Sequence, residues 1–401
     1  MSQAADRVVI VGAGPVGLVA ASYLSQAGVP VLIVEAHREL PQDLRASTFH
    51  PPTLDMLDRF GIGSKLVERG LVCQQWQFRD RNEGVVATFN LSLLEGLTNH
   101  PYRLQCEQWK LSEELRSLLE GNDLVEIRYE AEAVGVTQDD FGVTLTVRRP
   151  DDALEEIRGR YLIASDGARS VVRKTLGIPF EGQTIPEIFL SMSTHFDFAK
   201  AIPNLAPIAY ITDPQEWAVL LRTPSLWRVL LPTDPNQTEE QIKDPKAMNA
   251  RLQALCPNDR DYDIVHATAY RVNERVATRY MEGRIFLAGD AAHVNNPLGG
   301  MGMNGGIHDA VNLSEKLVQV WNGAANLDLM GRYERQRRKA AVEAVQAQTL
   351  RNRAMMNETD PAARRAYHDE LRATVANPER HRAYVMRSSM IQSLNDLREV
   401  A

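Results

Sequence analysis

Cysteine is scarce in this sequence: only Cys73, Cys106 and Cys256 occur in 401 residues. The three lie far apart and form no C-x-x-C pair. This pattern argues against a metal knuckle, a redox-active dithiol and a disulfide framework of the secreted type. We therefore expect reduced, mostly buried thiols and no metal site.

Long apolar runs are also missing. The apolar stretch 8–24 is interrupted by Gly12, Gly14 and Gly17, and it is shorter than a membrane span needs. It also lacks the basic segment that opens a signal peptide. No other segment approaches roughly 20 uninterrupted apolar residues. The sequence therefore predicts a cytoplasmic protein with no membrane association.

The chain carries no excess of positive charge either. Its formal net charge is −7 and its isoelectric point is about 5.8. A mildly acidic surface repels phosphate backbones, so we expect no nucleic-acid partner. With 44% hydrophobic and 24% charged residues, the composition is that of an ordinary globular protein. The length suffices for two domains, or for one large domain with an inserted module.

What the sequence does contain begins with a nucleotide-binding pattern. Residues 8–11 are a β-branched apolar run typical of a buried parallel strand, and the segment after them matches G-x-G-x-x-G, with Pro15 between its glycines. Gly12 permits a tight turn, Gly14 lets the backbone approach a pyrophosphate, and Gly17 lets the next helix pack closely on the strand. The N-terminus of that helix offers free N–H groups to phosphate.

An acidic residue stands where such a site needs one. A second apolar run, 29–34, ends at Glu35, which lies 18 residues past Gly17. A carboxylate at this distance can accept hydrogen bonds from the ribose hydroxyls of an adenosine. Strand, glycine turn, helix and acid together predict a dinucleotide site, and they leave open whether it binds FAD or NAD.

Two later segments carry further motifs. Residues 161–173, YLIASDGARSVVR, contain Asp166 before a glycine, and residues 284–293, RIFLAGDAAH, contain Gly289 and Asp290 after a buried strand. Ligands of open α/β sheets bind at the carboxyl edge of the strands, where Asp290 can hydrogen-bond a ribityl hydroxyl. The run 299–306, GGMGMNGG, allows the backbone to approach a flat ring, and the helix after it can direct N–H groups at the pyrimidine end of a flavin.

In this order the three motifs resemble those of the p-hydroxybenzoate hydroxylase class of FAD-dependent, single-component aromatic monooxygenases. The resemblance covers most of the chain and is specific for the family, although it does not identify a substrate. It implies an α/β fold: a discontinuous Rossmann-type FAD-binding domain, a β-sheet substrate domain and C-terminal helices. The FAD contacts that it implies are Gly12, Gly14, Pro15, Gly17, Glu35, Arg45, Gln108, Asp166, Gly289, Asp290, Pro297, Gly300, Gly302, Met303 and Asn304, with Gln105 as the alternative to Gln108.

The resemblance also implies a reaction. NAD(P)H reduces FAD, the reduced flavin reacts with O2 to give a C4a-hydroperoxide, and this species hydroxylates a small phenolic or hydroxy-heteroaromatic substrate. The protein must exclude water and hold the ring within reach. Because the chain has only one G-x-G-x-x-G and no cysteine pair, we expect NAD(P)H to bind without a Rossmann domain of its own. A homodimer is the default oligomeric state.

The organisation of the chain follows from these positions. We assign 1–75, 101–180 and 275–350 to the FAD-binding domain, 76–100 and 181–274 to the substrate domain, and 351–401 to C-terminal helices. The segments 188–198, 217–221 and 227–231 are strand-like and are bounded by proline-containing turns. From residue 330 to about 357 the pattern predicts one long helix, whose basic cluster at 332–339 we interpret as a solvated face.

The sequence determines the substrate contacts less well. The candidates are His50, His195, Tyr210, Arg222 and Pro297, with Trp227 and Tyr270 in the same segments. Arg222 suits a substrate carboxylate or phenolate. His195 and Tyr210 can polarise a hydroxyl, Pro297 acts through its backbone beside the flavin, and His50 can face the flavin. For each side chain, a packing or surface role is the alternative.

Three other functions share parts of this pattern. A flavin-dependent halogenase would carry a G-W-x-W-x-I-P segment, which this sequence lacks. A reductase of the geranylgeranyl-reductase type would reduce a double bond without consuming oxygen. A non-catalytic flavin-binding regulator would bind a partner without oxidising NAD(P)H.

Overall fold

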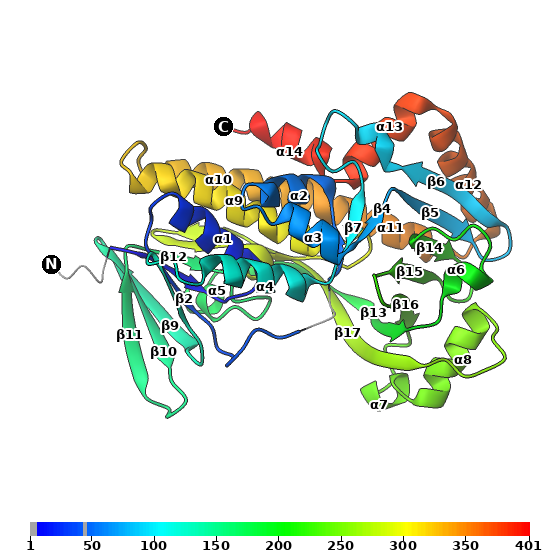
Figure 1. Ribbon diagram of the computed structural model, residues 1–401, viewed down its shortest axis with the longest axis horizontal. Helices are drawn as coiled ribbons and strands as arrows, with labels where there is room; N and C mark the ends of the chain where they lie inside the picture. Colours follow the sequence, from blue (N-terminus) through cyan, green and yellow to red (C-terminus); the bar gives the residue numbers. More distant parts are fainter. Residues whose placement is uncertain (1–5, 43–45) are drawn as a thin grey trace.

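The computed structural model describes residues 6–42 and 46–401 and contains two large sheets, with helices packed along both (Figure 1). The predicted contact Arg45 lies outside the described residues. In the part of the chain that is described, no helix is both long and apolar enough to cross a membrane. Cys73, Cys106 and Cys256 are free and buried, as predicted.

The first sheet has six strands in the order β18–β19–β12–β1–β2–β8. They span Met281–Glu282, Ile285–Leu287, Tyr161–Ala164, Val8–Val11, Val31–Val34 and Val125–Arg128. Strands β2, β1, β12 and β19 pair in parallel, so the segments that follow them meet at one edge. All four are completely buried, which explains why their sequences are continuous apolar runs without alternation. The predicted α/β fold with a mostly parallel first sheet is confirmed.

Helices and a β-meander cover this sheet. Helices α1 (Pro15–Gln26), α4 (Gln108–Leu119), α9 (Gly302–Trp321) and α10 (Leu329–Lys339) pack beside one another. The antiparallel strands β9 (Glu132–Asp139), β10 (Gly142–Arg148) and β11 (Leu154–Gly159) pack against β1 and β12. Shorter helices are α2 (Pro51–Asp58), α3 (Gly63–Arg69) and α5 (Val171–Thr175). The shared core of these elements supports the edge where the motifs meet.

The second sheet has eight strands in the order β20–β17–β13–β16–β15–β14–β5–β6. They span His293–Val294, Ile264–Ala277, Phe180–Thr194, Trp227–Thr233, Ala218–Arg222, Ile208–Thr212, Gln75–Asp80 and Gly84–Asn90. Successive side chains of a strand point to opposite faces. One face buries Trp76, Phe189 and Tyr210 together with Leu298. The other face packs on the segment that carries α6 (Phe198–Ala201), α7 (Glu239–Ile242) and α8 (Pro245–Leu255).

C-terminal helices cover the face of the second sheet that carries Tyr210. They are α11 (Ala347–Met356), α12 (Pro361–Ala376), α13 (Pro378–Ser388) and α14 (Ile391–Arg398), and the upper right of Figure 1 shows α12 and α13 beside β5 and β6. Asp360 and Asn377 cap α12 and α13, each followed by a proline at the first helical position. The long helix predicted after residue 330 runs from α10 into α11 through a π-helical segment, Ala340–Gln346.

Two long strands connect the sheets. β13 and β17 pair along their whole length, from Phe180 opposite Ala277 to Thr194 opposite Ile264. The predicted domain boundaries at 180/181 and 274/275 therefore fall inside strands. The pairing register shifts between Thr184 and Ile188, around Pro186, since proline has no N–H for the ladder. A small sheet of β3 (Thr48–Phe49), β7 (Arg103–Gln105) and β4 (Leu71–Cys73) lies between the two large ones.

Candidate active site

The glycine turn after β1 is packed as the sequence predicts. Gly12 has φ +99°, and a Cβ there would lie 2.6 Å from the Ser165 carbonyl oxygen. A Cβ on Gly17 would lie 2.1 Å from the carbonyl oxygen of Gly12. Gly14 precedes Pro15, the first residue of α1, and a Cβ on Gly14 would meet no described atom within 4 Å. The turn is therefore closed toward the sheet and open at Gly14, on the side where a pyrophosphate would approach.

Glu35 stands next to this turn. Its carboxylate accepts hydrogen bonds from the backbone N–H of Ala13 (2.8 Å) and of His37 (3.0 Å). These bonds hold the acid at the end of β2, one strand away from Gly12. This is where a carboxylate must lie to reach the ribose of a dinucleotide whose pyrophosphate sits on the turn.

Asp166 and Gly289 bring the other two motifs to the same edge. One Asp166 carboxylate oxygen accepts from Val172 N–H (3.2 Å), while Oδ1 is buried without a hydrogen-bond partner among the described residues. Burial raises the pKa of this carboxyl, although hydrogen bonds to the Ser170 side chain and to backbone N–H groups oppose the shift. Gly289 has φ +62°, and a Cβ there would lie 2.8 Å from Val16 in the glycine turn. The open turn and the unsatisfied carboxylate oxygen fit the polyhydroxylated, phosphate-bearing chain of FAD.

A buried ion network fixes the Gly289–Asp290 turn. Asp309 Oδ2 accepts from Gly289 N–H (3.0 Å) and lies 2.8 Å from His293 Nε2, and Asp309 Oδ1 accepts from Arg337 Nε (2.6 Å). Asp309 is 0% exposed and Arg337 2%. Burial alone would raise the pKa of the Asp309 carboxyl, but its interactions with His293 and Arg337 lower it. The network positions the turn and leaves the Asp290 side chain exposed beyond β19.

The basic cluster at 332–339 thus contains a residue that the sequence analysis placed wrongly. We interpreted the cluster as a solvated face, but Arg337 is among the largest fully buried side chains of the protein. Its partner Asp309 lies one element earlier, on α9. Sequence alone did not connect Asp309 with Arg337, because the two residues lie on different helices.

The segment that follows Pro297 forms a second tight loop. Pro297 O accepts from Gly300 N–H (2.9 Å), and Gly299 and Gly300 have φ +119° and +66°. Gly302 and Met303 then open α9. The loop exposes backbone where side chains would otherwise stand, which a flat ring requires of its neighbours.

Asn304 ties this loop to the segment before α2. Its side-chain amide donates to the carbonyl oxygens of Thr48 (2.8 Å) and Gly300 (2.7 Å), and its Oδ1 accepts from His50 N–H (2.9 Å). All of its hydrogen-bonding groups are therefore used within the protein. Asn304 positions the loop, and its place in the flavin contact set stays a prediction.

His50 is held against the same loop. Its Nε2 lies 2.9 Å from the Gly299 carbonyl oxygen, which makes Nε2 the protonated nitrogen, and its buried Nδ1 has no partner in the part of the chain that is described. Burial first, and then the nearby Arg103 charge, holds the pKa of His50 well below its usual 6.5. His50 is therefore neutral and offers an unused acceptor beside the loop.

Tyr210 lies on the eight-stranded sheet, beside the Gly299–Gly300 loop. It lies on β14, is completely buried, and is near both the Gly299 backbone and the Arg103 side chain. Burial raises the pKa of its hydroxyl, and the Arg103 charge opposes this shift. The structure thus brings His50 and Tyr210, two of the predicted substrate contacts, together beside the Gly299–Gly300 loop.

Arg103 is the residue of this group that sequence reasoning missed. It is 2% exposed on β7, one of its terminal N–H groups donates to Ser388 O (3.0 Å), and its guanidinium lies 4.9 Å from the Trp76 ring. Its Nε lacks a hydrogen-bond partner, and no carboxylate of the described residues pairs with it. Burial lowers the pKa of Arg103. A signal was present in the sequence, since Arg103 lies two residues before Gln105, so the two side chains share a face.

The structure does not bring Arg222 and His195 to this group. Arg222 follows Ala218 and Leu220 in the alternation of β15, and these pack on the face opposite Tyr210. Its guanidinium lies 5.8 Å from the Trp227 ring, which is buried on that same face. His195 is 61% exposed and pairs with Asp263 (2.6 Å) at the surface. The roles of Arg222 and His195 as substrate contacts therefore stay predictions.

The two glutamines lie where β7 leads into α4. Gln105 is buried, its amide donates to Thr48 Oγ1 (2.8 Å), and its oxygen accepts from Ser47 Oγ (3.0 Å). Gln108 is the first residue of α4 and is half-buried, with its N–H donating to Ala46 O (2.9 Å). Gln108 keeps a side chain available for a ligand, and the predicted cofactor contact remains a prediction for it.

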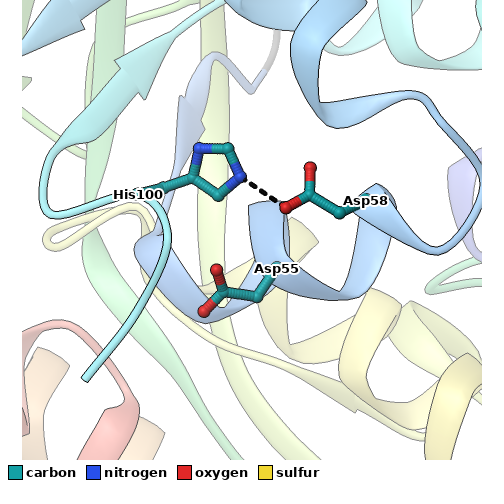
Figure 2. Close-up of side chains that lie close together, drawn as sticks. All are labelled: Asp55, Asp58 and His100. Carbon is teal, nitrogen blue, oxygen red and sulfur yellow. Dashed lines mark hydrogen bonds and ion pairs between the residues drawn. The ribbon is translucent and has the colours of Figure 1, made fainter. Parts of the chain in front are cut away.

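One group of side chains has the composition of a metal site. Figure 2 shows Asp55 and Asp58 on α2 facing His100, and one potential ligand atom of each lies within 4.8 Å of the others. His100 already uses both ring nitrogens, at 2.8 Å from Asp58 Oδ2 and 2.8 Å from the Tyr102 hydroxyl. Asp55 Oδ1 accepts from Asn99 N–H (3.0 Å). These contacts account for the group as a clamp between α2 and the chain that leads to β7.

Comparison with known proteins identifies the family. A family model described as an FAD binding domain matches residues 6–348. Para-nitrophenol 4-monooxygenase of Pseudomonas sp. (strain WBC-3) is 34% identical over 364 residues, which cover 90% of this chain and 89% of that protein. 6-Hydroxy-3-succinoylpyridine 3-monooxygenase of Pseudomonas putida (strain DSM 28022 / S16) is 35% identical over 345 residues, 85% of this chain and 86% of that protein.

A solved structure agrees with these relatives. The crystal structure of p-nitrophenol 4-monooxygenase from Pseudomonas putida DLL-E4 is 31% identical, covers 98% of both chains and gives a TM-score of 0.92. The similarity extends over both sheets and the C-terminal helices. It favours oxygen-dependent hydroxylation over the reductase, halogenase and regulator alternatives. The chain belongs to the FAD-binding family of class A, single-component aromatic monooxygenases, and it is an FAD-dependent aromatic hydroxylase.

Proposed function

We propose that this enzyme hydroxylates a small single-ring phenol or hydroxypyridine, and that it binds this substrate as the anion between the Gly299 loop and the Tyr210 face of the substrate sheet. The names of two relatives support the class, since one acts on para-nitrophenol and the other on a hydroxypyridine. Both compounds carry an acidic ring hydroxyl.

The observation that carries the proposal is the buried charge of Arg103. A buried guanidinium without a carboxylate costs several kcal/mol unless something compensates it. Here the compensation from the protein is partial: one carbonyl, one aromatic face and a neighbouring tyrosine. An anionic ligand would complete it, and a phenolate beside Arg103 and Tyr210 would lie at the Gly299 loop.

The state of His50 supports binding as the anion. Because its pKa lies well below 6.5, His50 is a poor acceptor for the phenolic proton at neutral pH. Its free Nδ1 can still accept a hydrogen bond from an N–H or O–H group on the ring. The ionised substrate is therefore selected from solution, and the Arg103 charge favours that form.

The chemistry of oxygen transfer is supplied by FAD when it is bound, with NAD(P)H as the reductant and O2 as the oxidant. The residues of this chain do the rest. Glu35, Asp166 and the glycine turn would hold the cofactor chain, and the Gly299–Gly300 loop would leave room for the flat ring. Arg103, Tyr210 and His50 orient the substrate ring and its negative charge.

The test is turnover and binding by the FAD-loaded enzyme. NAD(P)H oxidation, oxygen uptake and product mass are followed with 4-nitrophenol, pentachlorophenol and 6-hydroxynicotinate. A product that carries one added oxygen atom supports the proposal. Where the new hydroxyl replaces a ring substituent, release of that substituent supports it equally. If none of these ionisable rings stimulates oxidation while neutral aromatics do, the proposal is wrong.

Replacement of Arg103 tests whether the enzyme recognises the negative charge of the substrate or only its aromatic ring. We expect Arg103→Met to raise the dissociation constant of 4-nitrophenolate about 10- to 150-fold, since a hydrogen bond to a charged group contributes about 1.5–3 kcal/mol. The variant should fold, because removal of the Arg103 charge leaves no buried carboxylate without a partner. Arg79→Met is the matched control, because Arg79 is also buried but donates to the carbonyl oxygens of Pro203 and Asn204 on the opposite face of the sheet, and it should change the constant little. Perturbation of the flavin absorption spectrum measures both, and equal constants for the two variants would refute a role of Arg103.

A further inference from the structure

A cavity of about 260 Å³ lies outside the substrate sheet, between α11, α12 and α13. A cavity of about 150 Å³ suffices to hold benzene, so a single substituted ring fits into this one. Arg351, Arg380 and Arg387 line it, together with one carboxylate, Glu370. It is therefore a cationic cavity on a chain whose net charge is −7.

Its arginines are available to a ligand. Arg351 and Arg387 are exposed, and neither forms an ion pair with a carboxylate of residues 6–42 or 46–401. Among the described residues, the guanidinium of Arg380 makes one long hydrogen bond, to Thr374 Oγ1 (3.4 Å). Unpaired guanidinium groups around a concave surface raise the local concentration of anions and accelerate their capture.

The inner wall of the cavity is also a wall of the proposed substrate position. Tyr384 lines the cavity, and its ring stacks on Phe89 at 4.4 Å and lies 6.0 Å from Trp76. Trp76 in turn lies 4.9 Å from the Arg103 guanidinium. A second link is Asn352, which lines the cavity and donates to Leu298 O (3.2 Å), one residue before Gly299.

We propose that this cavity is the access site for the anionic aromatic substrate, with Arg351 and Arg387 as its capturing charges and Tyr384 as the side chain that separates it from the buried site. The inference rests on the proposed function. The path would run from the cavity arginines to Arg103, with the rings of Tyr384 and Trp76 between them. A phenolate would therefore stay close to positive charge throughout its transfer. Burial raises the pKa of Tyr384, so this wall stays neutral and does not repel the anion.

The size of the cavity decides between substrate and nucleotide. NAD(P)H is also anionic, but a dinucleotide far exceeds the volume that suits one ring. We therefore assign the site to the aromatic substrate. The alternative appears in the test as an effect on NAD(P)H kinetics.

The experiment compares two double variants of the FAD-loaded enzyme. Arg351→Gln/Arg387→Gln removes the two capturing charges. Arg365→Gln/Arg382→Gln removes two exposed charges of α12 and α13 that do not line the cavity, and it gives the same change of net charge. Stopped-flow perturbation of the flavin spectrum by 4-nitrophenolate measures the association rate constant at low salt and at about 0.5 M salt.

We expect the cavity variant to lose about three- to tenfold in association rate constant at low salt, with kcat unchanged and the loss diminished at high salt. The control variant should lose less than half as much. Equal losses in the two variants, or a loss confined to the KM for NAD(P)H, would refute the access site and leave the proposed function standing. Failure of the wild-type enzyme to bind any of several phenolates would refute the proposed function, and the access site with it.

Discussion

Replacement of Asp309 by asparagine tests whether the buried ion network stabilises the Gly289–Asp290 turn. The change keeps the shape of the side chain and removes only its charge. It leaves Arg337, which is 2% exposed, without an anion, and His293, which is 3% exposed, without its carboxylate. Removal of one partner of a buried pair costs about 3–5 kcal/mol.

We therefore expect Asp309→Asn to lower the free energy of unfolding by about 3–5 kcal/mol in urea titrations followed by circular dichroism. The turn at Gly289 should loosen as well, because Asp309 also accepts its N–H, so FAD should dissociate more readily in fluorescence measurements. The double variant Asp309→Asn/Arg337→Met removes the stranded charge and should recover part of the loss. A loss below about 1 kcal/mol for the single variant would refute this reasoning.

Two further outcomes follow from other buried groups. Glu35→Gln keeps the contact with the Ala13 N–H but loses the charge-assisted hydrogen bonds to ribose hydroxyls. We therefore expect the FAD dissociation constant, measured by flavin fluorescence, to rise about tenfold. An unchanged constant would remove Glu35 from the FAD site. Burial lowers the pKa of His308 to about 3, below the unfolded value of 6.5, so the unfolded state gains a proton first as the pH falls. Stability should then decline by at most about 1.4 kcal/mol per pH unit between pH 6.5 and 3, and His308→Asn should flatten that decline in urea titrations of the two proteins; parallel pH profiles would refute it.

The sequence predicted the parts of the site whose geometry is local. Val8–Val11, the glycine turn and Glu35 lie within one strand–helix–strand unit, and backbone sterics fix their relation. The face on which Arg222 lies could not be predicted because it depends on where β15 pairs with β16, and a shift of one residue exchanges the faces. The spacing in the sequence placed Arg103 on the same strand face as Gln105, but it could not show that no carboxylate of the described residues pairs with Arg103. That absence is a property of the surrounding fold and not of the segment 103–105.

The order of the first sheet has a consequence for synthesis of the protein. Its central strand, β1, begins at residue 8, but its neighbour β12 ends at residue 164 and β19 ends at residue 287. A nascent chain therefore leaves the ribosome with β1 unpaired on one side for more than a hundred residues. At about 5–20 residues per second, the segment between β1 and α9 takes roughly 15–60 s to synthesise, and the FAD site is complete only after it. Until then the apolar strands β1 and β2 are exposed, and a chaperone that binds extended apolar segments would have its target at the N-terminus.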